Sequence, residues 1–441
     1  MHTPITEEKV FKDPVHNYVH VQDDIIWRLI NTPEFQRLRR VRQLGTSFLT
    51  FHGAEHSRFS HSLGVYEITR KIISQFERRG YPDWPKEERL LALCAALLHD
   101  LGHGPFSHSI EEAFQMNHED WTCRILIGDT CVNEVLREVD PDFPGRVASV
   151  IDKTYEKPIV INLVTSPLDA DRMDYLLRDA YYTGVNYGTI DIDRILRMLR
   201  PYRDRVVVKE SGMHAVEDYL MSRYQMYWQV YFHPVTRSSE IILRQIFRRA
   251  KSLYESGYSF GFMVDPLPAL FEGKPTVRQY LRLDEALIQT AFLQWTLERD
   301  ELLSDLCGRF MHRRLYKYVE IDTIDLETID GIRQAFLKAG LHPEYDLEID
   351  FPTDLPYDEF HSGSPASDKQ ILLLDRHEQL REISEVSDIV RSISGIHRGR
   401  YHLYYPEDKV KKVWDKLPAD VVSLLEQGVK KLDPSTREEF A

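Results

Sequence analysis

Histidine is concentrated in one stretch of this sequence. Seven of the 18 histidines lie in the 67 residues from 52 to 118, where an even distribution over 441 residues would place fewer than three. They are His52, His56, His61, His99, His103, His108 and His118. Imidazole is the commonest metal ligand and the commonest general acid or base in enzymes. The stretch is therefore expected to carry a metal site, an acid–base site or both.

His99 and Asp100 are the strongest candidates because of their surroundings. They end the apolar segment ERLLALCAALLHD and precede the two glycines of LGHG, so a core helix carries two polar side chains at its end. A buried carboxylate without a partner is costly, and a metal ion is one of the few partners that offset the cost. Local capping or hydrogen bonding is the alternative, and for any one histidine alone it is the better explanation.

Two more residues complete a set of metal ligands. We expect His61, in RFSHSLG, and Asp171, in LDADRMDYLLRD, to join His99 and Asp100. Two imidazoles and two carboxylates form a mixed nitrogen and oxygen set that suits a divalent transition metal, namely Fe, Mn, Zn or Ni. Such a set leaves coordination positions open for water and substrate.

The elements that position these residues are predicted to be mainly helices. Apolar residues recur at helical spacing, with proline or serine near the start of a segment and glycine after its end. The sequence predicts helices at residues 33–44, 60–79, 88–100, 169–180 and 215–231. The alternating segment NYVHVQD, which precedes all of them, is typical of a short strand or one arm of a hairpin.

The pattern changes beyond residue 317. The segments RLYKYVEI, DLEIDF, ILLLD and RYHLYY are typical of strands, and helical segments lie between them. The stretch FPTDLPYDEFHSGSPASDKQ is rich in proline, serine, glycine and acid and indicates a loop or linker. We therefore predict a mainly α protein with a short N-terminal hairpin and a small α+β C-terminal region. The predicted divisions are residues 1–50, 51–317 and 318–441.

Composition argues against several classes of protein. A net charge of −14 argues against a surface that exists to coat nucleic acid. The apolar run from Leu90 to Leu98 is about half as long as a membrane helix, and the segment MHTPITEEKVFKDP lacks the pattern of a secretory signal. Four cysteines without a Cys-x-x-Cys pair indicate a reducing compartment without disulfides or a thiolate zinc site. We expect a cytoplasmic protein that binds no membrane.

An ordered series of motifs runs through the same part of the chain. It comprises FKDPVHNYVHV, TPEFQRLRRVRQLG, HSRFSHSLGV, LLHDLGHGPFSH and LDADRMDYLLRD. In this order the motifs closely resemble those of the HD-domain deoxynucleoside triphosphate triphosphohydrolases, over roughly residues 10–317. The resemblance implies a helical HD-domain core and an enzyme that hydrolyses a deoxynucleoside triphosphate (dNTP) to a deoxynucleoside and triphosphate.

The resemblance also implies roles for individual residues. The metal ligands are His61, His99, Asp100 and Asp171, and Mg²⁺ accompanies the nucleotide. His108 is the implied general acid, which Glu111 orients, and the implied lining of the phosphate site is His103 and His118. The implied substrate-binding residues are Gln43, Leu44, Arg58, Arg172, Tyr175, Asp179, Arg223 and Tyr231.

Helical spacing agrees with part of this assignment. Asp171, Tyr175 and Asp179 stand four residues apart, so one face of a helix can hold the metal and the sugar. Arg223 and Tyr231 belong to a second stripe of the same period. Ordinary core packing with a solvated arginine is the alternative for such stripes.

A regulatory site is implied by the same family. Asn31, Gln36 and Arg39 fall where relatives bind a guanine nucleotide at a subunit interface of a homotetramer, so a GTP or dNTP effector is expected. An amide offers guanine one acceptor and one donor where a carboxylate offers two acceptors, so Asn31 weakens the case for guanine. A basic helix face in solvent is the alternative for RLRRVRQ.

Two other functions use the same features. One is an HD phosphodiesterase or alarmone hydrolase with the same metal ligands, although Gln43 and Tyr231 favour a deoxyribose substrate. The other is a nucleotide-regulated protein that binds single-stranded nucleic acid through the basic residues 37–42, which the acidic net charge makes the weaker alternative.

Overall fold

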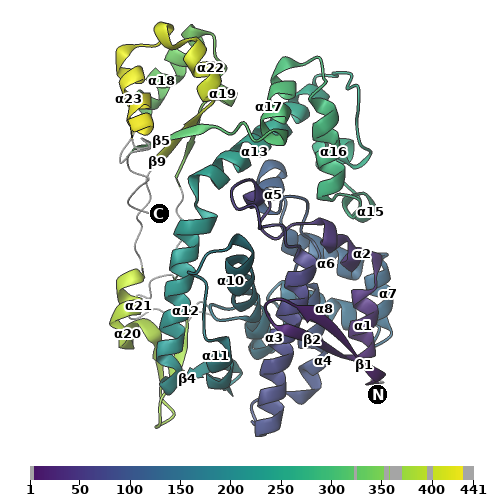
Figure 1. Ribbon diagram of the computed structural model, residues 1–441. Helices are drawn as coiled ribbons and strands as arrows, with labels where there is room; N and C mark the ends of the chain where they lie inside the picture. Colours follow the sequence, from purple (N-terminus) through teal and green to yellow (C-terminus); the bar gives the residue numbers. More distant parts are fainter. Residues whose placement is uncertain (1–3, 322–324, 352–356, 358–369, 395–400, 431–441) are drawn as a thin grey trace. The chain divides into compact units, whose positions relative to one another are not determined.

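The structure is a computed structural model that describes residues 4–321, 325–351, 357, 370–394 and 401–430 (Figure 1). Helices dominate these residues and the strands are short, which confirms a mainly α protein. The chain divides into two compact units. The first unit comprises Met1–Gln229, Met263–Ala291 and Leu355–Ile396, and the second comprises Val230–Phe262, Phe292–Asp354 and His397–Ala441. The domain boundaries predicted after residues 50 and 317 stay predictions.

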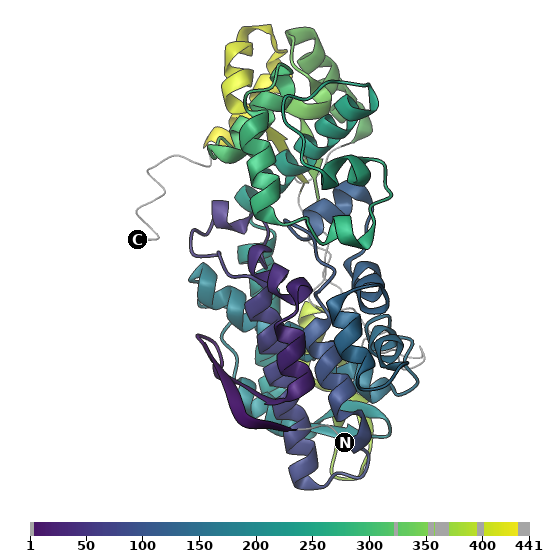
Figure 2. The same cartoon turned by 90° about the vertical axis from the view of Figure 1, so that its right-hand side faces the viewer.

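The first unit opens with the predicted hairpin. Strand β1 (Pro4–Asp13) pairs antiparallel with β2 (Asn17–Asp23). The Asp13 carboxylate accepts the backbone N–H of His16 at 2.9 Å, and Asn17 takes a left-handed conformation with φ +64°, which asparagine tolerates better than most residues. In Figure 2 this purple hairpin lies against the helices that follow it.

Three helices form the centre of the first unit (Figure 1). Helix α3 (Arg58–Arg79) packs against both α4 (Arg89–Leu98) and α10 (Ala170–Thr183). Every residue of α4 after the first is buried, as its apolar sequence predicts. The helix predicted at residues 60–79 begins two residues earlier than expected, at Arg58, because Ser57 and not Ser60 takes the N-cap position.

Other helices surround this centre. They are α1 (Asp24–Ile30), α2 (Pro33–Arg37), α5 (His108–Phe114), α6 (His118–Ile127), α7 (Cys131–Arg137), α8 (Phe143–Ile151), α9 (Pro158–Val164), α11 (Ile192–Met198), α12 (Met213–Met226), α14 (Pro266–Phe271), α15 (Val277–Tyr280), α20 (Ile383–Val386) and α21 (Asp388–Ile393). Helix α16 (Glu285–Trp295) begins in the first unit and ends in the second. A four-stranded sheet completes the first unit, in the order β3 (Leu199–Tyr202), β4 (Arg205–Lys209), β7 (Leu372–Leu374) and β8 (Leu380–Glu382).

Two predicted helices end earlier than expected. Helix α2 gives way to a 3-10 turn at Leu38–Arg40, because the Val41 carbonyl accepts the backbone N–H of Arg58 at 2.9 Å and so leaves the helical pattern. Helix α12 ends at Met226 and continues as a π-helical turn at Tyr227–Tyr231. At the end of α2 a tertiary contact thus overrides helical periodicity.

The second unit combines part of the region beyond residue 317 with helices from earlier in the chain, whereas β7 and β8 of that region belong to the sheet of the first unit. Its sheet has the antiparallel order β5 (Lys317–Ile321), β9 (Tyr401–Tyr405) and β6 (Glu348–Asp350). Its helices are α13 (Pro234–Glu255), α17 (Glu301–Met311), α18 (Leu326–Ala339), α19 (Pro343–Asp346), α22 (Glu407–Lys412) and α23 (Ala419–Lys430). The four segments predicted as strands all contain one. Most of the predicted linker lies outside the described residues.

None of the helices in the described part of the chain is both long and apolar enough to cross a membrane.

Candidate metal centre and active site

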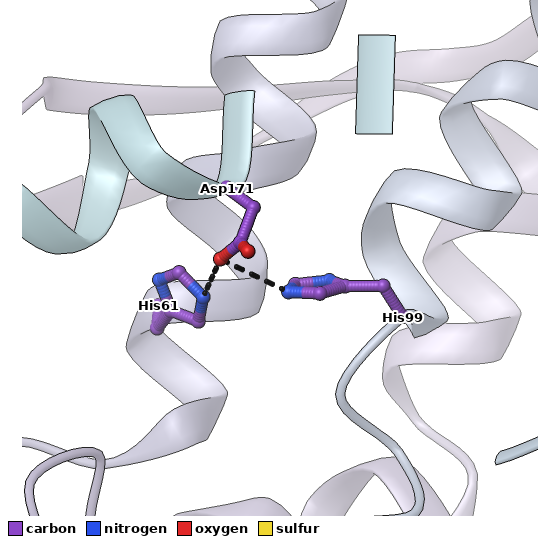
Figure 3. Close-up of side chains that lie close together, drawn as sticks. All are labelled: His61, His99 and Asp171. Atoms are coloured by element: carbon purple, nitrogen blue, oxygen red, sulfur yellow. Dashed lines mark hydrogen bonds and ion pairs between the residues drawn. The ribbon is translucent and has the colours of Figure 1, made fainter. Parts of the chain in front are cut away.

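Three helices bring three of the four predicted metal ligands together (Figure 3). His61 comes from the first turn of α3, His99 follows the last residue of α4, and Asp171 lies in the first turn of α10. Asp171 Oδ1 is 3.0 Å from His61 Nε2 and 3.5 Å from His99 Nε2. One ligand atom from each residue lies within 4.8 Å of the others, which is the separation that a shared metal ion requires.

Asp100 joins this cluster from the next position in the chain. Its Oδ1 is 3.3 Å from His99 Nε2, and its Oδ2 is 3.7 Å from His61 Nε2. The Arg58 guanidinium also donates to Asp100. Burial raises the pKa of Asp100, but the charge of Arg58 and the nearby imidazoles lower it well below its ordinary value, so the carboxylate is ionised at neutral pH.

The donor set fits a divalent metal. His99 Nδ1 lies 2.9 Å from the Ala96 carbonyl, which can only accept, so this nitrogen carries the proton and Nε2 presents a lone pair to the cluster. His99 Nε2 is buried and has no hydrogen-bond partner among the described residues. Burial lowers the pKa of His61, but the carboxylates of Asp171 and Asp174 raise it to about 10. A site that draws a proton this strongly also favours a cation.

A third carboxylate, which lies behind the cluster, was not predicted from the sequence. Asp174 is fully buried and accepts from His61 Nδ1 at 2.8 Å and from His16 Nε2 at 2.5 Å. Arg178 donates to the same carboxylate at 2.8 Å and to Asp13 at 2.9 Å. A carboxylate on the far nitrogen of a ligating imidazole fixes its tautomer and aim. The acid and base four residues apart in DYLLRD are the signal that could have identified this network.

His103, His108 and His118 form a second cluster around Glu111. Its Oε1 lies 2.8 Å from His103 Nδ1, and its Oε2 lies 2.9 Å from His118 Nδ1 and 3.7 Å from His108 Nδ1. The rings of His103 and His118 stack with centroids 3.8 Å apart. Burial and the charge of Arg58 lower the pKa of His103 to about 4, so this ring is neutral at pH 7. The His108 side chain is exposed, whereas that of His103 is buried.

Several predicted substrate residues carry buried polar atoms that lack a hydrogen-bond partner within the described part of the chain. These atoms are Gln43 Oε1, Arg172 Nε and Arg223 Nε. Burial raises the pKa of Tyr175, and the positive charge of Arg223 partly offsets this increase. The two side chains are therefore close enough to interact electrostatically. Such atoms can bond a ligand without giving up a protein partner.

The structure places the other predicted substrate residues differently. The buried Asp179 Oδ1 lies 2.7 Å from His56 Nε2. No role was predicted for His56 from the sequence. Arg58 is committed to Asp100 and to Ser107, whose Oγ lies 2.8 Å from Arg58 Nη2. Leu44 is half-buried. Tyr231 ends the π-helical turn and belongs to the second unit.

The three predicted effector residues lie on or beside α2. Gln36 Nε2 donates to the Ile30 carbonyl at 2.7 Å, and Arg39 Nε donates to Gln36 Oε1 at 2.8 Å. The Arg39 guanidinium lies 3.5 Å above the centre of the Phe59 ring. Asn31 is exposed, and its side chain donates to the Trp27 carbonyl at 2.7 Å.

Two known protein families match parts of the chain that contain predicted site residues. The HD domain family matches residues 58–152, and the HD associated region matches residues 190–257. The uncharacterized protein YwfO of Bacillus subtilis is 56% identical over 407 residues, which cover 92% of this chain and 94% of the relative. This chain belongs to the HD-domain family.

More distant relatives indicate the chemistry within that family. The solved structure of a phosphohydrolase from Bacteroides thetaiotaomicron is similar with a TM-score of 0.79 and 28% identity, over 90% of this chain and 100% of that one. The deoxynucleoside triphosphate triphosphohydrolase SAMHD1 homolog of Dictyostelium discoideum is 27% identical over 354 residues, which cover 75% of this chain and 65% of the relative. The chain is therefore an HD-superfamily phosphohydrolase, and the resemblance predicted from its motifs is confirmed.

Proposed function

We propose that this protein is a metal-dependent dNTP triphosphohydrolase that releases a deoxynucleoside and triphosphate. The observation that carries metal-dependent hydrolysis is the convergence of His61, His99, Asp100 and Asp171. The dNTP substrate is proposed from the similarity to the SAMHD1 homolog. These residues suit Fe, Mn, Zn or Ni. When bound, such a metal lowers the pKa of water toward neutrality, and Mg²⁺ accompanies the triphosphate.

His108 is the proposed general acid. It donates a proton to the 5′ oxygen as the bond between that oxygen and the α-phosphorus breaks and the water oxygen takes its place on phosphorus. Glu111 supports this role because its Oε2 lies 3.7 Å from Nδ1 of the exposed His108 ring. His103 and His118, whose Nδ1 atoms lie 2.8 Å and 2.9 Å from the same carboxylate, are proposed to line the phosphates.

Residues on α10 and α12 are proposed to bind the rest of the nucleotide. Tyr175 and Asp179 follow Asp171 along one face of α10, so they meet the sugar next to the metal. Arg172 and Arg223 neutralise the phosphates, and their free Nε atoms support this assignment. The same role is proposed for Arg58, and Gln43, Leu44 and Tyr231 are proposed to enclose the deoxyribose.

Regulation and assembly follow from the family resemblance. We propose that a GTP or dNTP effector binds Asn31, Gln36 and Arg39 at a subunit interface of a homotetramer in the cytoplasm. The contact between Gln36 and Arg39 supports this, because it holds an amide and a guanidinium side by side on the surface.

Product analysis tests the proposed reaction directly. Purified protein is incubated with each dNTP and Mn²⁺ or Mg²⁺, with and without GTP, beside ribonucleotides, cyclic nucleotides and 3′-phosphorylated nucleotides. We expect a deoxynucleoside and triphosphate, and in isotopically labelled water we expect the label in triphosphate. Pyrophosphate or single phosphate as product, or a preference for another class of nucleotide, contradicts the proposal.

A matched pair of histidine variants tests the site. His99→Ala removes a metal ligand and is expected to abolish turnover while the protein still folds. His377→Ala is the control, because this histidine also precedes an acid, Glu378, but lies on an exposed turn. Turnover that survives in His99→Ala refutes the metal assignment.

A further inference from the structure

The turn that carries His99 and Asp100 has three consecutive carbonyls that side chains from elsewhere hold in place. Tyr280, at the end of α15, donates its hydroxyl to the Gly102 carbonyl at 2.6 Å. Arg37, at the end of α2, donates to the His103 carbonyl at 2.9 Å and to the Leu101 carbonyl at 3.4 Å. Two segments distant in sequence thus fix the orientation of successive peptide units.

Thr122 of α6 holds the same turn from another side. Its Oγ1 donates to the His99 carbonyl at 3.1 Å and accepts the backbone N–H of Gly102 at 2.8 Å. Gly102 has no room for a side chain, because a Cβ there would lie 2.2 Å from the His118 carbonyl oxygen. The turn therefore fits against α6 with little freedom to shift.

The donors are themselves held rigidly. The Tyr280 ring stacks on Trp121 with centroids 3.9 Å apart and an interplanar angle of 5°, so its hydroxyl has a fixed aim. The buried Arg37 guanidinium also donates to the Leu283 carbonyl at 2.9 Å. A buried charge is costly, and packing alone would be served better by an apolar side chain. What the Arg37 position gains is several donors in a fixed geometry.

We propose that Tyr280, Arg37 and Thr122 are positioning residues that set the aim of His99 and Asp100. The proposal rests on the proposed function, since it assigns these two side chains to a metal. Both protrude from the turn whose peptide units the three residues hold, so a tilt of those units moves half of the ligand set. Displaced ligands weaken metal binding before they unfold the protein.

The first test is Tyr280→Phe, which keeps the stacked ring and removes only the hydroxyl. We expect the full-length protein to bind Mn²⁺ alone about 10- to 100-fold more weakly in competition with a chelator, as for other outer partners of metal ligands. The control is Tyr66→Phe, because the buried Tyr66 also donates to a backbone carbonyl, that of His20, at 3.1 Å. Both variants lose one hydrogen bond, so their thermal unfolding is expected to shift alike. Equal affinity for Mn²⁺ in the two variants overturns the proposal.

The second test uses Thr122 and its conservative replacement. Thr122→Val loses both bonds to the turn, whereas Thr122→Ser keeps the hydroxyl, so we expect Mn²⁺ affinity to fall in the first and to recover in the second. With dNTP at saturating Mn²⁺, kcat is expected to fall in the valine variant while KM stays the same. Wild-type Mn²⁺ affinity in Thr122→Val overturns the proposal. Mn²⁺ binding needs no nucleotide, so failure of dNTP turnover in the wild type refutes the proposed function and leaves this test readable.

Discussion

At the residue scale, the two acids that flank His61 differ in what they face. Asp171 faces the open side of the metal cluster with two imidazoles, whereas Asp174 lies behind it and meets Arg178, His16 and His61. The first arrangement leaves oxygen lone pairs for a ligand. The second uses them within the protein and so aims His61.

Asp174→Asn is predicted to weaken the metal site more than the fold. The amide cannot accept from three donors as a carboxylate does, so His61 loses its fixed aim and Mn²⁺ affinity is expected to fall by about 10- to 100-fold. Metal retention during chelator titration measures this. Glu67→Gln is the matched control, because Glu67 is equally buried but bonds Arg70 at 2.7 Å. A comparable loss of metal in both variants would contradict the role of Asp174.

Gly64→Ala is predicted to disturb the same network by steric conflict. A Cβ at this position of α3 would lie 1.8 Å from Asp174 Oδ1, so the carboxylate must move. Overpacking of this kind costs about 1–3 kcal/mol of unfolding free energy. Gly145→Ala in α8 is the control, because its Cβ meets nothing within 4 Å and alanine favours a helix by up to about 1 kcal/mol. Urea unfolding curves for the two variants should therefore move in opposite directions.

At the element scale, the sequence predicted those parts of the site whose position depends on a single helix. The apolar segment of α4 placed His99 and Asp100 at a helix end, and the four-residue spacing placed Asp171 on one face of α10. The contacts that complete the site join residues far apart in the chain, such as Tyr280 with Gly102. The residues around one partner do not indicate which distant residue it contacts, so hydrophobic periodicity could not predict these contacts.

The N-cap of α10 provides a prediction at this scale. Asp169 accepts the backbone N–H of Arg172 at 2.6 Å and also pairs with the Arg172 side chain. Asp169→Ala is expected to lose about 1–2 kcal/mol of stability from the cap and to lower activity, because it loosens the turn that carries Asp171. Asp191→Ala is the control, since Asp191 caps α11 at 2.9 Å but is exposed. Full activity in both variants would show that the Asp169 cap does not position Asp171.

At the scale of the whole molecule, two units with separate cores are expected to unfold in separate transitions. The second unit has its own core, formed by β5, β9, α18 and α23. It also contains a charged cluster in which Lys409 Nζ lies 2.9 Å from both Asp305 and Asp346. Arg309 pairs with Asp305 and Asp408 at 2.8 Å each. Acid should therefore weaken the second unit through the carboxylates of Asp305 and Asp408, whose pKa values are lowered by their basic partners.

The sign of this pH dependence follows from the pKa of Asp305. Burial raises that pKa, but Lys409 and Arg309 outweigh burial and lower it below the ordinary value. The folded state thus prefers the ionised carboxylate, and the stabilisation is present above about pH 4 to 5 and is lost as the pH falls further. Lys409→Met removes the main partner, so its deficit in unfolding temperature is expected to be largest at neutral pH and to shrink on acidification. Lys411→Met is the control, because Lys411 pairs with Glu407 across one helical turn on the surface, and its small deficit should stay nearly constant. Calorimetry from neutral to acidic pH distinguishes the two, and a deficit in Lys409→Met that does not change with pH would show that the Lys409 to Asp305 pair contributes nothing to acid sensitivity.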